Sequence, residues 1–112
     1  MASEPSEYLI VITTCASEEQ ARALTTALLE KRLAACVQAS DISSSYRWQG
    51  AIESSNEVRL MIKARQADYA AIETLIVAMH SYATPQVLAI PLIAGSRAYL
   101  EWLDAETLRQ VD

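Results

Sequence analysis

The stretch from Leu33 to Arg65 reads LAACVQASDISSSYRWQGAIESSNEVRLMIKAR and predicts one long β-hairpin. Its outgoing strand begins at Leu33, its tip is the segment Tyr46-Arg47-Trp48-Gln49-Gly50, and its return strand covers Asn56 to Lys63. Strands of roughly a dozen residues exceed the usual length of about 5–6. Such a hairpin overhangs the core that a chain of 112 residues can build. We therefore expect the overhang to contact a second copy of the protein, with Tyr46 and Trp48 as interface anchors.

The two strands of the hairpin differ in pattern. In the return strand Val58, Leu60 and Ile62 share one face, which is the period-two alternation of a half-buried strand. The outgoing strand is polar from Gln38 to Ser45, and we expect a bulge or bend there.

The rest of the chain divides into elements on either side of the hairpin. In chain order we predict a flexible tail at residues 1–7, a central strand at Tyr8–Cys15, a helix from Ser17 to about Arg32, the hairpin, a helix over Gln66–His80, an edge strand over Gln86–Ile93, and a helix capped by Ser96 and anchored by Tyr99, Leu100, Trp102 and Leu103. The last strand is placed at an edge because Pro91 cannot donate to a ladder. Residues 8–112 then form a single domain.

This order, β-α-β-β-α-β plus a terminal helix, is the ferredoxin-like pattern. The predicted fold class is α+β, a ferredoxin-like βαββαβ two-layer sandwich with a long hairpin between the second and third strands and a C-terminal helix. Right-handed crossovers place both main helices on one face of the sheet. The first strand is apolar on both sides, so the other face would be an exposed apolar patch in a monomer. Closed cyclic assembly would cover this patch and the overhang together.

Composition excludes several functional classes. A formal net charge of −5 argues against a nucleic-acid partner, which needs a basic surface. The acidic N-terminus lacks the features of a secretory signal, and no apolar run approaches the ~18 residues that span a bilayer. We expect a cytoplasmic protein without membrane insertion, in which Cys15 and Cys36 are thiols. The sequence has no glycine-rich phosphate loop, and it has no Ser-His-Asp or Cys-His set at a catalytic spacing. An enzyme is therefore not favoured.

Several segments together resemble one family. They are Glu30–Val37 at a helix-to-strand junction, Tyr46–Gly50 at the hairpin tip, Glu57–Lys63 in the return strand, His80–Gln86 in place of a His-Pro-Tyr-Glu-x-Pro-Glu signature, and Tyr99–Leu103 in the closing helix. This combination resembles the CutA divalent-cation tolerance proteins over about residues 8 to 104. The resemblance implies a stable ferredoxin-like homotrimer, linked to tolerance of copper and other divalent metals.

The chain departs from the family signature where a metal would need ligands. Ser81 replaces the signature proline, and Ala83 and Gln86 replace its two carboxylates. Carboxylate oxygens are good ligands for hard and borderline cations, so their loss weakens a carboxylate-based site. The strand position that carries a metal-binding cysteine in some members corresponds to Thr13, and Cys15 lies two residues further on the same face.

The candidate metal ligands are therefore His80, the only histidine, and Cys15. The alternative interpretations are a hydrogen-bonded histidine at a helix end and a thiol in the core. One imidazole and one thiol are too few for a closed site of about four donors, so a copper or other divalent cation would bind weakly. Tyr82, Lys63, Glu57 and Arg47 are candidates for a ligand cleft between subunits; scattered charges on strands are alternatively solvated or paired.

Two functions are candidates, and the first is what the family resemblance implies. The first is a homotrimeric, cytoplasmic, copper-binding protein in the response to metal ions. The second is a trimeric scaffold or small-molecule sensor that binds a metabolite or partner protein at inter-subunit clefts without metal. An enzyme using Tyr82 or His80 as acid or base is the least favoured function.

Overall fold

The computed structural model describes residues 7–108 and confirms the predicted α+β, ferredoxin-like fold. Its elements are β1 (Tyr8–Cys15), α1 (Glu18–Glu30), β2 (Cys36–Trp48), β3 (Ala51–Arg65), the 3₁₀ turn η2 (Gln66–Asp68), α2 (Tyr69–Met79), β4 (Leu88–Pro91) and α3 (Arg97–Glu106). The predicted tail lies, apart from Glu7, outside the described residues. None of the described helices is long and apolar enough to cross a membrane.

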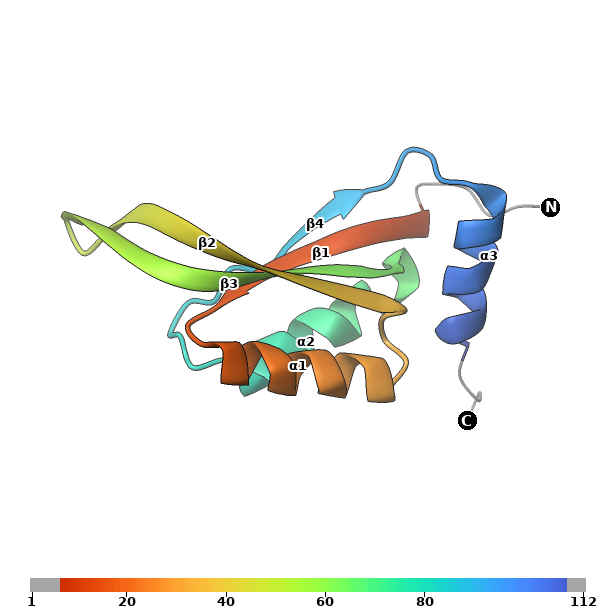
Figure 1. The fold of residues 1–112 in the computed structure, drawn as a ribbon, viewed down its shortest axis with the longest axis horizontal. Helices are drawn as coiled ribbons and strands as arrows, with labels where there is room; N and C mark the ends of the chain where they lie inside the picture. Colours follow the sequence, from red (N-terminus) through yellow and green to blue (C-terminus); the bar gives the residue numbers. More distant parts are fainter. Residues whose placement is uncertain (1–6, 109–112) are drawn as a thin grey trace.

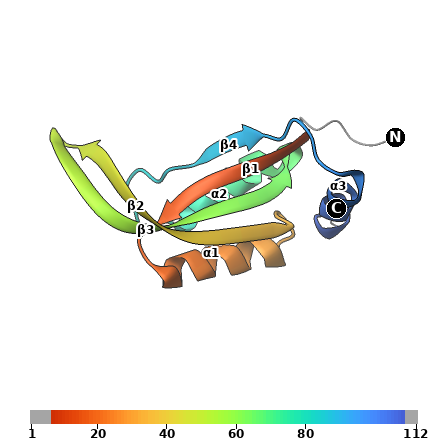
Figure 2. The ribbon, with the colours of Figure 1, turned by 45° about the horizontal axis from the view of Figure 1, so that its top comes forward.

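The four strands form one antiparallel sheet in the order β2-β3-β1-β4, so β1 is central and β4 is an edge strand, as Pro91 predicted. Helices α1 and α2 lie together on one side of this sheet, and the hairpin of β2 and β3 extends well beyond them (Figure 1). Figure 2 shows the same two layers from a second angle, with α3 at the end opposite the hairpin tip.

Several predicted boundaries were wrong, those of β2, α2 and β4 for local reasons. Strand β2 begins at Cys36 rather than Leu33, because Arg32 ends the helix with a left-handed φ of 56° and the Leu33 N–H then donates to the Leu28 carbonyl. The second helix starts at Tyr69, after η2, and ends before His80, whose backbone is extended. Strand β4 is shorter than predicted, because only Leu88–Pro91 pairs with β1.

The hairpin is more regular than its composition indicated. Residues pair without interruption from Cys36 opposite Lys63 to Trp48 opposite Ala51, so the predicted bulge is absent. The return strand begins at Ala51 rather than Asn56. Polar side chains bridge the overhang: the Ser45 and Ser54 hydroxyls are 3.0 Å apart. Gln49, at φ 50°, and Gly50, at φ 82°, close the tip in left-handed conformations.

The core lies between the sheet and the two main helices. The predicted alternation of β3 is confirmed, because Val58, Leu60 and Ile62 are all buried against this core. From the other elements the core receives Leu9, Val11 and Cys15 of β1, Ala21, Leu24 and Leu28 of α1, and Ile72 and Ile76 of α2. Ser17 caps α1 as predicted, since its hydroxyl accepts from the Gln20 N–H at 3.2 Å.

The other face of the sheet, called the open face below, carries the apolar side chains predicted for β1. Direct cross-strand partners point to the same side of a sheet, and Ile10 and Ile12 pair with Ile90 and Leu88 of β4. Leu88 is 54% exposed and Ile90 is 48% exposed. No described helix covers this side (Figure 2).

Helix α3 packs across the end of the sheet through Leu100 and Leu103, which are buried with Tyr8. Ser96 caps it, and the Tyr8 hydroxyl donates to Asp104 at 2.7 Å. The expectation that Tyr99 and Trp102 also anchor this helix was wrong, because both aromatic rings remain exposed.

Candidate functional site

His80 lies directly after α2, beside the end of β1. Its Nε2 is 2.6 Å from the carbonyl oxygen of Thr14, and its Nδ1 accepts from the Tyr82 N–H at 3.1 Å. A carbonyl can only accept, so Nε2 carries the proton and the ring is held as that tautomer. Both ring nitrogens of His80 are therefore engaged by the backbone.

Tyr82 stands against His80 and reaches a carboxylate of the hairpin. The two rings are tilted with their centroids 4.6 Å apart, and the Tyr82 hydroxyl donates to Glu57 at 2.7 Å. Burial, the hydrogen bond to Glu57 and the negative charge of Glu57 together raise the pKa of Tyr82 to about 12. At neutral pH this hydroxyl is protonated and acts as a donor.

Glu57 is the ionised centre of the cluster. Partial burial pushes the pKa of Glu57 upward, but hydrogen bonds with Ser44, Tyr82 and Thr14 and the nearby His80 ring outweigh that effect. The pKa of Glu57 is therefore lowered from its ordinary value of 4.5. The carboxylate is stabilised mainly by hydrogen bonds from neutral donors.

Cys15 ends β1 and is buried in the core. Burial, and secondarily the charge of Glu57, raise the pKa of the Cys15 thiol, so it is protonated at neutral pH. Thr13, on the same face, is also fully buried, and its hydroxyl has no hydrogen-bond partner in the described part of the chain. Cys36 is likewise a free thiol, as predicted.

The donors do not form a closed metal centre in this conformation. Within residues 7–108 there is no group of three or more His, Cys, Asp or Glu side chains placed to hold a metal ion. The imidazole lone pair at Nδ1 is already used, and the Cys15 thiol is the protonated form, which is a poor ligand. A cation at His80 would have to displace one of its hydrogen bonds.

The structure brings together only some of the predicted cleft residues. Glu57 and Tyr82 are in direct contact, and Tyr46 approaches them from the hairpin with its hydroxyl 3.3 Å from that of Ser55. Lys63 is at the other end of the sheet, with its Nζ 5.7 Å from the centroid of the Tyr99 ring. Arg47 is exposed at the hairpin tip.

Sequence reasoning missed Thr14 and Ser44. The contribution of Thr14 includes its backbone carbonyl, which any residue type would supply. Ser44 could have been found from the hairpin register, because it pairs with Ser55, two positions from Glu57 on the same face.

Because the pKa of Glu57 is lowered in the folded protein, folding stability is expected to depend on pH. A carboxylate whose folded pKa is depressed contributes stability above its unfolded pKa and loses that contribution as pH falls through the folded pKa. Glu57→Gln is therefore expected to lower the thermal midpoint at pH 7, and the gap to wild type should close as the pH falls through the lowered pKa of Glu57.

Thermal scans between pH 7 and pH 2 measure this gap. Tyr82→Phe removes one donor to Glu57 and so raises the folded pKa of Glu57 towards its unfolded value. In that variant the loss of stability on acidification should be smaller, and it should be complete at a higher pH than in wild type. A gap between wild type and Glu57→Gln that stays constant across the range would contradict the assignment.

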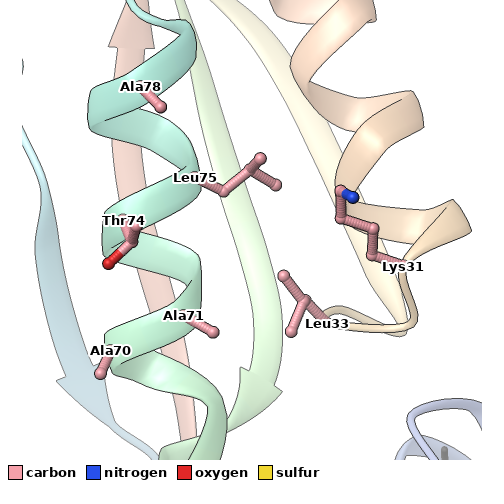
Figure 3. Close-up of a pocket in the computed structure, with 7 residues that line it drawn as sticks. All are labelled: Lys31, Leu33, Ala70, Ala71, Thr74, Leu75 and Ala78. Carbon is pink, nitrogen blue, oxygen red and sulfur yellow. The ribbon is translucent and has the colours of Figure 1, made fainter.

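A separate groove lies between the two main helices on the outside of the helix layer (Figure 3). It has a volume of about 450 Å³, and Leu33 and Leu75 point into it from opposite sides. Its other lining residues are Lys31, Ala70, Ala71, Thr74 and Ala78. None of the predicted site residues lies in this groove.

Comparison with known proteins agrees with this architecture. Residues 9–106 match the family model of the CutA1 divalent ion tolerance protein. The divalent-cation tolerance protein CutA of Thermus thermophilus is 38% identical over 99 residues, which are 88% of this chain and 96% of that protein.

Two solved structures are similar across nearly their whole length. The periplasmic divalent cation tolerance protein CutA of Archaeoglobus fulgidus superposes with a TM-score of 0.89 at 37% identity, covering 90% of this chain and 99% of the other. CutA of Synechococcus elongatus PCC7942 gives a TM-score of 0.90 at 34% identity, covering 96% of each chain. The matches of sequence and of fold together show that this chain belongs to the CutA1 divalent ion tolerance protein family.

Proposed function

We propose that this protein acts in tolerance of divalent cations as a homotrimeric binding protein and not as an enzyme. The open face carries this proposal. Its apolar side chains from β1 and β4, with Leu88 and Ile90 about half exposed, form a surface that a lone subunit leaves in contact with water. Exposed apolar patches of this kind are typical of interaction sites. The overhanging hairpin, with Tyr46 and Trp48 exposed, lies next to it.

The acid–base groups of the cluster support binding over catalysis. The Tyr82 hydroxyl, with a pKa of about 12, and the buried Cys15 thiol are both protonated at neutral pH. A nucleophile or general base needs a pKa close to the working pH. The His80 ring nitrogens are both committed to the backbone.

We propose that copper or another divalent cation binds weakly at His80, with Cys15 as a second donor. Losing a hydrogen bond at His80 costs about 0.5–1.5 kcal/mol, and deprotonating the buried thiol costs more at neutral pH. Both costs make the affinity low and make it rise with pH, because cation binding releases a proton from the thiol.

Calorimetric titration with Cu²⁺ in metal-free buffer tests this site. Loss of a residue that only supports a metal ligand typically lowers metal affinity by roughly 10–100-fold. Loss of a ligand itself should cost at least as much, so His80→Ala is expected to weaken binding by at least about tenfold. Cys15→Ala should also weaken it, and Cys36→Ala is the matched control that should not. Equal affinity in wild type, His80→Ala and Cys15→Ala would remove the metal assignment.

The second candidate function is a scaffold or sensor that binds a metabolite or partner protein at inter-subunit clefts without metal. The engagement of both His80 nitrogens favours it, since Glu57 and Tyr82 remain as polar groups beside aromatic rings. A thermal-shift screen separates the two functions. Stabilisation by metabolites in the presence of a chelator, with none by any divalent metal, would favour the sensor.

We also propose that the protein works in the cytoplasm. Cys15 and Cys36 are both free, as is usual in a reducing compartment. The relative from Archaeoglobus fulgidus is described as periplasmic, so the compartment is not common to all similar proteins.

A further inference from the structure

Two aromatic patches lie at opposite ends of the molecule. The tip patch is formed by Tyr46, Trp48 and Glu53 of the hairpin. Tyr46 pairs directly with Glu53, and Trp48 is two residues further along β2, so all three side chains point to the open face. Both aromatic rings are exposed, Trp48 to 46%.

The end patch is formed by Lys63, Tyr99 and Trp102. The rings of Tyr99 and Trp102 are 5.4 Å apart, and the Lys63 Nζ lies over the Tyr99 ring. Lys63 pairs with Cys36 and with Ile10, so it also stands on the open face. Trp102 is 42% exposed, whereas Leu100 and Leu103 of the same helix are buried.

One chain cannot join its own two patches. The molecule is 50 Å long, and the hairpin tip and α3 occupy its two ends (Figure 1). The hairpin is a continuous two-stranded ladder without a bulge or hinge, so it cannot fold back onto α3. Any contact between the patches must therefore join two copies.

We infer that the tip patch of one copy packs against the end patch of the next copy, and that Glu53 then pairs with Lys63 across this contact. This inference rests on the proposed homotrimer and names the residues that hold it together. Each patch offers two aromatic side chains, which are typical anchors of interfaces. Their charges are complementary, with one carboxylate at the tip and one ammonium at the end.

Neither charge is satisfied within a single subunit. Among residues 7–108 the two ion pairs are Arg22 with Glu18 and Arg65 with Asp68, and neither Glu53 nor Lys63 takes part in them. The ammonium of Lys63 has an aromatic face below it. A carboxylate from a second copy would complete the contact, since close pairing across an interface favours opposite charges.

The contact uses two different surfaces, so it is head-to-tail. Such contacts close into a ring when the rotation between copies allows it, and otherwise extend into a fibre. A ring of three copies satisfies all three tips and all three ends.

Charge reversal tests the pairing. Glu53→Lys and Lys63→Glu are each expected to raise the concentration at which the homotrimer dissociates by roughly tenfold, because like charges then meet. The double variant Glu53→Lys/Lys63→Glu should return to within about threefold of wild type. Sedimentation velocity over a dilution series measures this midpoint. A homotrimer too stable for dilution is compared by its dissociation midpoint in guanidinium chloride.

Glu30→Lys/Lys31→Glu is the matched control, because it makes the same two changes on exposed residues at the end of α1, in the helix layer. It should leave the midpoint unchanged. A double-mutant cycle with Trp48→Ala and Trp102→Ala should be non-additive. The double variant should dissociate little more readily than the less stable of the two single variants.

The outcomes separate this inference from the homotrimer itself. Two results would overturn the pairing of tip and end while leaving a wild-type homotrimer intact. One is a double charge reversal that destabilises the assembly as much as the two single changes combined, and the other is an additive tryptophan cycle. Wild-type protein that is a monomer at every concentration would overturn both.

Discussion

A Leu88→Asp variant will lose self-association and sediment as a single chain of 12.3 kDa. Leu88 is more than half exposed in one subunit and pairs with Ile12 on the open face. A carboxylate placed there is solvated in a monomer but would become buried among apolar side chains in the proposed homotrimer. Burying an unpaired charge costs several kcal/mol. Three such charges per homotrimer are expected to abolish assembly at micromolar concentrations.

The control for this variant is Val77→Asp on α2. Val77 is 53% exposed, close to the 54% of Leu88, but it lies in the helix layer. The same gain of charge at the same exposure should therefore leave the particle mass unchanged. Far-ultraviolet circular dichroism checks that both variants keep the fold. Equal masses for the two variants would contradict an interface on the open face.

A Leu60→Ala variant will lose about 2–5 kcal/mol of folding stability through lost burial and the cavity that remains. Leu60 is fully buried at the centre of β3, on the face of the sheet that packs against the two main helices. Chemical denaturation at fixed protein concentration measures this loss. The concentration must be fixed because assembly into the proposed homotrimer would also contribute to apparent stability.

Leu29→Ala is the matched control for that loss. Leu29 is also a leucine but is exposed on α1, where alanine is an equally good helix former. Its replacement should cost well under 1 kcal/mol, as is usual for a surface substitution. A loss at Leu29 equal to that at Leu60 would contradict the position of the core.

The fold could be predicted because its determinants are local patterns. The alternation of Val58, Leu60 and Ile62 defines the face of β3 that meets the helices, and Pro91 excludes β4 from the centre of the sheet. Of the bulge or bend predicted for Gln38 to Ser45, the uninterrupted register excludes the bulge. In an overhang without a core both faces meet solvent or another subunit, so serines pair as well as apolar residues do.

The sequence could predict only those parts of the site that depend on side-chain type. Glu57, Tyr82 and His80 were chosen by residue type, and the structure brings them together. His80 contacts the backbone carbonyl of Thr14, which any residue type would supply, so the sequence could not predict this hydrogen bond. Lys63 does not lie with them within one subunit, because its register places it beside Tyr99 at the far end of the sheet.

The central claim is that a single subunit leaves its open face and hairpin uncovered and that copies of the chain cover them. Multi-angle light scattering on dilute wild-type protein tests it most directly. The expected particle mass is three times the chain mass of 12.3 kDa. A folded particle with the mass of one chain would contradict the claim.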